Sequence, residues 1–298
     1  MPFDSLPDFQ SIQAMTTPED IARALPIWDG PLTITPLGGG ITNVNLLVQD
    51  AVRRAVVRIG GDIPEHHIRR DVELAASRAA YAAGVAPAGL HAAPGALVID
   101  YIDARTLTAA DMCDDVMLDR ALALVARAHR EVPQHLRGAA PLFWVFHTLR
   151  DYAAGLDRAE VPALMQQAAV LERAVGAVDL IFGHNDLLPA NFLHDGARLW
   201  LIDWEYAGFN SPLFDLGAMA NCGLSLAQQR RMLTVYFGSS PDAGLWHRYM
   251  AMKAASALRE AMWSMVSEIH STLPMDYAAY TQANLATYHA AYAAFKET

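Results

Sequence analysis

Polar residues interrupt an apolar part of the chain between residues 183 and 203. The stretch GHNDLLPANFL places Asp186 and Asn191 five residues apart, and Asp203 follows twelve residues later in LIDWEYAG. A buried polar group without a partner costs roughly 1–3 kcal/mol. The stretch is therefore either an Asx-type turn that satisfies its own polar groups or a site. Oxygen ligands from two short strands, with a second acid nearby, suit a hard cation such as Mg²⁺.

The elements that must position these residues change in character along the chain. The first third contains strand-like segments in an order typical of an antiparallel meander, followed by one more strand: 31–37, 43–50, 53–60 and 95–102. A helix is expected over 66–83, ending at Gly84. Beyond a boundary near 101–108 the helical pattern dominates, with helices expected over 109–131, 142–156, 161–178, 225–237 and 243–270. Two short strand-like pieces, 191–195 and 198–203, flank a turn at Gly196.

Composition narrows the class of protein. The 298 residues are 53% hydrophobic and 18% charged, which is typical of a folded globule and not of a disordered chain. The net charge of −10 argues against a nucleic-acid partner, because binding to phosphate backbones depends on Lys and Arg. Cys113 and Cys222 lack metal-type spacing. No apolar signal region opens the chain and no segment reaches ~18 apolar residues, so we expect a cytoplasmic protein without membrane insertion.

The polar stretch matches a known phosphoryl-transfer pattern. Protein kinases carry H-R-D-x-x-x-x-N followed by D-F-G, in which the first Asp handles the substrate hydroxyl while the Asn and the second Asp hold Mg²⁺. The corresponding letters here are HNDLLPAN and DWE. Together with IDWEYAG and the following FDLG, they make the chain resemble the choline kinase and aminoglycoside phosphotransferase superfamily, and within it the bacterial choline/ethanolamine kinase branch.

The resemblance runs across nearly the whole chain and implies a fold. We expect an α+β, bilobal, protein-kinase-like fold with a small antiparallel-sheet N-lobe and a larger, mostly helical C-lobe. The N-lobe, residues 1–101, is expected to bind nucleotide. The C-lobe, residues 102–298, is expected to carry the catalytic and acceptor-binding residues.

The resemblance also implies an enzyme that uses ATP and Mg²⁺. Asp186 is expected to position the acceptor hydroxyl and accept its proton. Asn191 and Asp203 are expected to hold Mg²⁺, with Glu205 as a second-metal or water-mediated ligand. Two further residues are expected to support the catalytic loop without reacting: His184 and Asp215.

Nucleotide recognition is expected from three parts of the N-lobe. The run GGGITN resembles the family's phosphate loop, with Gly39 and Gly40 for close backbone approach and the side chains of Thr42 and Asn43 as donors, although a hairpin turn would use the same residues. Arg58 is expected to grip phosphate oxygens, oriented by Glu73 or by its competitor Asp71. The adenine is expected at the backbone of the segment that joins the lobes: Asp100, Tyr101 and Ile102.

The acceptor pocket departs from the family pattern. Glu260 and Trp263 lie three residues apart on one predicted helix face, where the resembling eukaryotic enzymes have two tryptophans. With Tyr206, they suit a small amino alcohol, choline first and ethanolamine second, because aromatic faces hold quaternary ammonium ions. The alternatives are thiamine, an aminoglycoside, or a pseudokinase that binds nucleotide without turnover. A packed core Trp with a surface Glu is the structural alternative.

Overall fold

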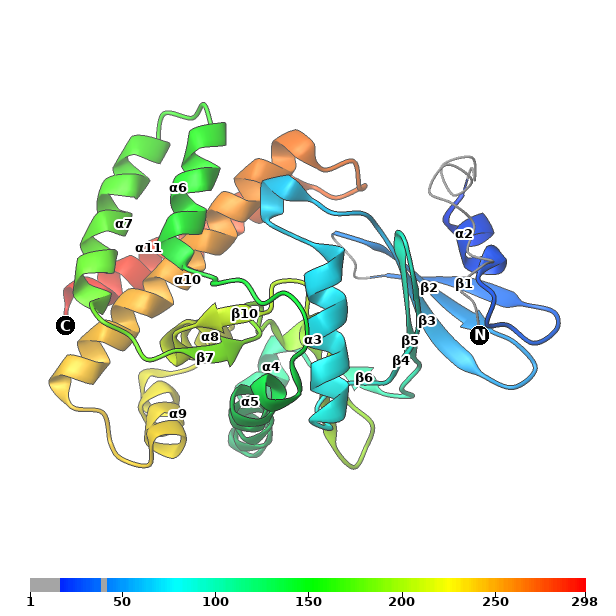
Figure 1. The fold of residues 1–298 in the computed structure, drawn as a ribbon. Coiled ribbons are helices and arrows are strands. Elements are labelled where there is room, and N and C mark those ends of the chain that lie inside the picture. Colours follow the sequence, from blue (N-terminus) through cyan, green and yellow to red (C-terminus); the bar gives the residue numbers. More distant parts are fainter. Residues whose placement is uncertain (1–16, 39–41) are drawn as a thin grey trace.

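A sheet-rich part and a helix-rich part of the chain lie on opposite sides of α3 (Arg70–Ala82) (Figure 1). The computed structural model describes residues 17–38 and 42–298, so the predictions on Gly39 and Gly40 lie outside the described residues. Helix α3 packs against a helix of the C-terminal part and against the edge strand β4. The expected α+β class, with an N-terminal antiparallel sheet and a mostly helical remainder, is confirmed.

The N-terminal sheet has five strands in the order β1-β2-β3-β5-β4, and all neighbours are antiparallel. Its strands are β1 (Thr33–Leu37), β2 (Val44–Gln49), β3 (Arg54–Ile59), β4 (Gly89–Ala93) and β5 (Ala96–Asp100). Alternate side chains such as Leu46, Val48, Ala55 and Val57 are buried, as a half-covered sheet requires. They form a small core with α2 (Pro18–Ala24), which the side chain of Thr17 caps by accepting from Asp20 N.

Helix α3 begins later than the sequence pattern predicts. Instead of one helix over 66–83, a 3₁₀ turn, η1 (Pro64–His66), comes first, and His67 then adopts a positive φ of 60°. That left-handed residue breaks the helical path, and the continuous helix starts only at Arg70.

The C-terminal part is built around α10 (Ala243–His270), which packs against α6, α7, α8 and α11. The remaining helices here are α4 (Ala109–Met112), α5 (Asp115–His135), α6 (Val145–Gly155), α7 (Val161–Val175), α8 (Pro212–Ala220), α9 (Leu226–Phe237) and α11 (Tyr277–Lys296). The single helix expected over 109–131 is wrong, because α4 ends at Met112 and Asp114 caps a new helix by accepting from Met117 N. Helices α8 and α11 were not predicted.

Short strands hold the polar stretch between the helices. Strand β7 (Ile181–Gly183) pairs with β10 (Gly208–Asn210), and a second sheet has the order β6-β8-β9. Its strands are β6 (Arg105–Thr106), β8 (Phe192–His194) and β9 (Leu199–Leu201). The 3₁₀ turn η2 (Pro189–Asn191) ends the loop that leaves β7. None of the described helices combines the length and the apolar character that crossing a bilayer requires.

Candidate active site

One buried carboxylate braces the loop that follows β7. Asp215, on α8, accepts hydrogen bonds from the backbone N–H groups of His184 and Asn185, both at 2.8 Å. His129 Nε2 lies 2.9 Å from the same carboxylate. Burial alone would raise the pKa of Asp215, but His129 and the backbone donors outweigh burial and lower it. This geometry fits the structural role proposed for Asp215.

Two residues of the site have strained backbones. Asn185 has a φ of 63° and Asp203 a φ of 69°, and such conformations cost on the order of 1–3 kcal/mol and gather at functional sites. The Asn185 side chain stays in place by donating to the carbonyl oxygens of Tyr206 and Gly208 at 3.0 and 3.2 Å. His184 Nε2 donates to the carbonyl of Ile202 at 2.8 Å, so the two polar loops are joined.

Asp186 lies at the edge of a cavity with 15% of its side chain exposed. Asn191 Nδ2 donates to the Asp186 backbone oxygen at 2.8 Å and to its Oδ2 at 3.0 Å. Burial raises the pKa of Asp186 to about 8, although the neighbouring guanidinium of Arg259 opposes the shift. A carboxylate with a pKa near neutrality suits a group that must accept a proton.

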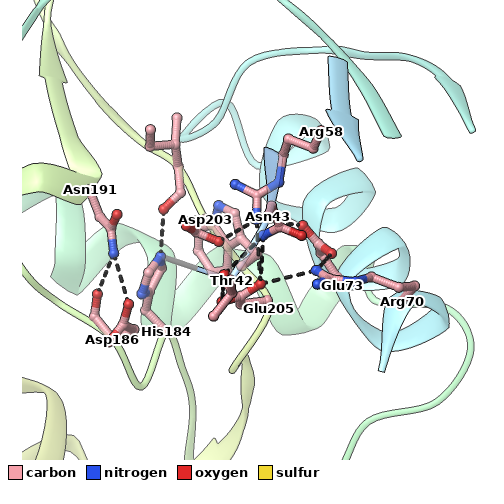
Figure 2. A network of polar contacts seen from close by, with 12 residues as sticks. Thr42, Asn43, Arg58, Arg70, Glu73, His184, Asp186, Asn191, Asp203 and Glu205 are labelled. Atoms are coloured by element: carbon pink, nitrogen blue, oxygen red, sulfur yellow. Dashed lines mark hydrogen bonds and ion pairs between the residues drawn. The ribbon is translucent and has the colours of Figure 1, made fainter. Parts of the chain in front are cut away.

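Three acids converge beside two guanidinium groups, as Figure 2 shows. Arg58, on β3, lies 2.6 Å from Asp203 and 3.0 Å from Glu73. Its alternative partner, Asp71, pairs with Arg69 at the surface instead. Of the two acids that the sequence offered as partners of Arg58, the structure pairs it with Glu73, which lies on the buried face of α3.

A second guanidinium completes the cluster. Arg70 Nη1 lies 2.6 Å from Glu73 and 3.0 Å from Glu205. Burial and the adjacent Asp203 raise the pKa of Glu205 to about 7. Thr42 Oγ1 donates to Glu205 at 2.8 Å and Asn43 Nδ2 at 3.1 Å. The side chains expected to bind phosphate therefore reach the same acid that was expected to bind metal.

The donor set fits a hard cation. Carboxylate oxygens of Glu73, Asp203 and Glu205 lie within 4.8 Å of one another, and Mg²⁺ prefers such ligands. Burial alone would raise the pKa of Asp203, but Arg58 and Arg70 outweigh burial and lower it, so Asp203 is suited to bind a cation as a carboxylate. Asn191 uses its Nδ2 on Asp186, so its Oδ1 is the atom with which it could bind a cation.

The segment joining the two parts of the chain follows β5 directly. The N–H groups of Asp100 and Tyr101 donate to the carbonyls of Ala88 and Arg54, at 2.8 and 3.2 Å. Arg54 also stacks over the Tyr101 ring at 4.1 Å. Adenine recognition must therefore use the other backbone atoms around Ile102, and it stays a prediction.

A cavity of about 280 Å³ lies against Asp186, between the catalytic loop and helices α8, α10 and α11. Arg259 and Glu260 both line it. Arg259 Nη1 lies 3.5 Å from Asp186 Oδ1 and 3.0 Å from Glu260 Oε2, so these two oxygens are no more than about 6.5 Å apart. The other Glu260 oxygen accepts from the Tyr280 hydroxyl at 2.7 Å. The Glu260 carboxylate thus faces the cavity close to Asp186, the expected catalytic base.

The two predicted aromatic residues are not among the residues that line this cavity. Trp263 Nε1 donates to the Tyr206 hydroxyl at 2.7 Å. The protein covers both rings itself, since Arg259 stacks on Tyr206 at 4.2 Å and His66 stacks on Trp263 at 4.7 Å. The structure therefore brings Glu260 to Asp186 but does not bring the rings of Tyr206 and Trp263 to the cavity.

Sequence reasoning missed three residues of the site: Arg70, Arg259 and Tyr280. Arg70 precedes Asp71 and Arg259 precedes Glu260 in the sequence. An arginine next to an acid is typical of an exposed helix face, so neither was expected in the site. In the structure both guanidinium groups lie against two acids each. A buried guanidinium needs such partners, so its burial indicates a charged cluster. Tyr280 lies on α11, which was not predicted.

Comparison with known proteins places the chain among kinases. A family profile described as choline/ethanolamine kinase matches residues 34–221. A probable ethanolamine kinase of Arabidopsis thaliana is 26% identical over 293 residues, covering 85% of this chain and 77% of that protein. A choline/ethanolamine kinase family protein from Mesorhizobium loti aligns with a TM-score of 0.72 and 28% identity, over 94% of this chain and 99% of the other. Choline kinase LicA from Streptococcus pneumoniae gives a TM-score of 0.74 at 20% identity, over 94% and 99%, and shows a shared fold.

Proposed function

The chain belongs to the choline/ethanolamine kinase family and is a phosphotransferase, and on this premise we propose that it phosphorylates the hydroxyl group of a small primary amino alcohol of the ethanolamine class. The motifs had put choline first. The covered rings of Tyr206 and Trp263 favour the opposite order, because a quaternary ammonium has no N–H to donate to Glu260 and would need the aromatic faces that these two residues do not offer.

The short distance between Asp186 and Glu260 carries the proposal. Two carboxylate oxygens within about 6.5 Å can bind the two ends of one small molecule. The hydroxyl would donate to Asp186 while the ammonium donates to Glu260, and a two-carbon spacer fits between them. A charge-assisted hydrogen bond to the ammonium contributes roughly 1.5–3 kcal/mol.

Asp186 is the proposed catalytic residue of this reaction. Its carboxylate would hold the acceptor hydroxyl in line with the γ-phosphate and take the proton as the new O–P bond forms. Alignment and charge neutralisation should contribute more than base strength, because the transition state of phosphoryl transfer is loose. His184 and Asp215 would keep the loop rigid, which a catalytic carboxylate requires.

The N-terminal part is the proposed nucleotide lobe, joined to the catalytic lobe at 101–102. Arg58 would bind phosphate oxygens, with Glu73 holding its guanidinium in place at 3.0 Å. Thr42 and Asn43 would move from Glu205 to the phosphates. Asn191, Asp203 and Glu205 would hold Mg²⁺, which would neutralise charge on the phosphates when bound.

The test compares acceptors in the wild type and in Glu260→Gln. Removing the charge should raise KM for ethanolamine at least about tenfold and leave KM for ATP unchanged, because of the two substrates only the acceptor is proposed to contact Glu260. Glu268→Gln, on the same helix but outside the cavity, is the matched control and should behave as the wild type. An ADP-release assay measures all three proteins. Binding of ATP without turnover of either ethanolamine or choline would contradict the proposal.

A further inference from the structure

The acceptor cavity extends well beyond the space that ethanolamine needs. We propose that it takes a 2-amino alcohol that carries an uncharged, mostly apolar side arm of roughly four carbon atoms. The inference rests on the proposed function, because the hydroxyl and the ammonium keep their places at Asp186 and Glu260. It adds the part of the acceptor that lies beyond them.

The volume is the first argument. The cavity measures about 280 Å³. One water-sized group takes about 30 Å³ of liquid volume, so the four non-hydrogen atoms of ethanolamine fill roughly 120 Å³. More than half of the cavity would stay empty, and ligand sites usually enclose most of the ligand they serve.

The shape shows where the extra space lies. Helix α8 lines the cavity with Phe214 and Ala218, which share one helix face, and the turn that follows Ala220 adds Asn221 and Cys222. From Phe214 to Ala220, its last residue, the helix rises by about 9 Å. The Phe214 end is fixed at the catalytic loop, because the adjacent Asp215 binds the loop backbone. The cavity therefore runs away from the reacting groups along α8.

Helix α10 forms the facing wall and closes the far end. Ser256 and Ala257 lie about one turn before Glu260 and also line the cavity. Asn221 Nδ2 donates to Ser256 Oγ at 3.0 Å, which links the two walls. Between Ser256 and Glu260 helix α10 rises by about 6 Å, which is about the length of a butyl group.

The distribution of charge defines the chemistry of the arm. The charged residues among the described lining are Asp186, Arg259 and Glu260, all at the catalytic end. The rest of the lining is uncharged: it combines apolar side chains such as Phe214, Ala218 and Ala257 with the polar side chains of Asn221, Ser256, Asn284 and Thr287. A second ammonium or a carboxylate on the arm would have no partner there. This excludes polycationic acceptors such as aminoglycosides and favours an alkyl arm.

A series of 2-amino-1-alkanols tests the inference with the wild-type protein. Ethanolamine, 2-amino-1-butanol and 2-amino-1-hexanol share the hydroxyl, the primary ammonium and their spacing, and differ only in the arm. Each methylene group taken out of water multiplies kcat/KM by about 4. We expect kcat/KM for 2-amino-1-hexanol to exceed that for ethanolamine at least about tenfold.

The outcomes separate the two proposals. A ratio of one or less overturns the apolar arm and leaves the proposed function intact. If no compound of the series consumes ATP, the proposed function fails and this inference fails with it.

A variant locates the arm between α8 and α10. Ala218→Leu places extra carbon atoms in the cavity and should lower the 2-amino-1-hexanol to ethanolamine ratio at least tenfold. Ala257→Val does the same from the opposite wall, should Ala218→Leu fail to fold. Ala283→Leu, on the exposed face of α11, is the control and should keep the wild-type ratio. An unchanged ratio in a folded Ala218→Leu protein contradicts the assigned position.

Discussion

Arg259 determines how the proposed base ionises. Its guanidinium is buried, stacks on Tyr206 at 4.2 Å and lies 3.5 Å from Asp186. Burial raises the pKa of Asp186 to about 8, and the positive charge of Arg259 keeps it from rising further. Arg259 is therefore a positioning residue, which acts on the acceptor through Asp186 and Glu260.

The pH profile of Arg259 variants tests this role. Only the carboxylate form of Asp186 accepts a proton, so kcat/KM should rise with pH and level off above about 8. Arg259→Met removes a cation that favours the carboxylate, so its rising limb should move to higher pH. Arg259→Lys keeps the charge and should stay closer to the wild type. If the rising part of the kcat/KM profile lies at the same pH in Arg259→Met as in the wild type, Arg259 acts only by packing.

At the scale of single residues, sequence reasoning reached the groups whose chemistry depends on local spacing. Asp186, Asn191 and Asp203 lie in two short loops that the motif spacing brings together. The aromatic faces of Tyr206 and Trp263 could not be judged in the same way, because the residues that cover them depend on how distant elements pack. His66 comes from η1, before α3, and reaches α10 only in the folded chain.

At the scale of elements, α8 anchors the catalytic loop through Asp215. Asp215→Ala would leave the buried N–H groups of His184 and Asn185 without their acceptor. Each unsatisfied group costs roughly 1–3 kcal/mol, so the free energy of unfolding should fall by about 3 kcal/mol or more. Urea unfolding followed by circular dichroism measures the change.

The matched control for Asp215 is another acid at a helix. Asp242 caps α10 by accepting from Leu245 N, and it is exposed. Asp242→Ala should cost only about 1 kcal/mol, as the loss of an N-cap does. Equal losses in the two variants would mean that Asp215 is an ordinary capping residue.

The elements that were missed share a cause. Helix α8 has two start signals, its N-cap Ser211 and its first residue Pro212. It spans only nine residues and is almost wholly buried, so its apolar residues show no helical periodicity in the sequence. In α11 the buried positions, such as Tyr277, Tyr288 and Phe295, are separated by alanines that fit either surface or core. Packing against α10 decides both helices, and the sequence pattern alone does not contain that information.

At the scale of the whole molecule, polar contacts connect the sheet to the helical part through the site. Arg58 on β3 pairs with Asp203, and Arg70 on α3 pairs with Glu205. Both acids are proposed metal ligands, so the residues that join the two parts would also contact the bound nucleotide and its cation. Nucleotide binding and the closure of the two parts should therefore be linked.

Asp203→Ala tests this link. Loss of the central ligand should remove the dependence of ATP affinity on Mg²⁺, so that calorimetry in MgCl₂ and in EDTA gives the same Kd within about twofold. Asp71→Ala, an exposed acid on α3 paired with Arg69, is the control and should keep the wild-type difference. A Mg²⁺-dependent affinity that survives in Asp203→Ala would exclude Asp203 as a metal ligand.

The most direct test of the whole account follows the phosphate itself. Purified protein, ATP, MgCl₂ and ethanolamine are followed by ³¹P nuclear magnetic resonance. The account predicts that the γ-phosphate signal is replaced by a phosphomonoester on the ethanolamine oxygen. Asp186→Asn should bind ATP normally and form this product at least about 100-fold more slowly, because its amide cannot accept the proton. Formation of inorganic phosphate alone, or an Asp186→Asn protein as fast as the wild type, would contradict the account.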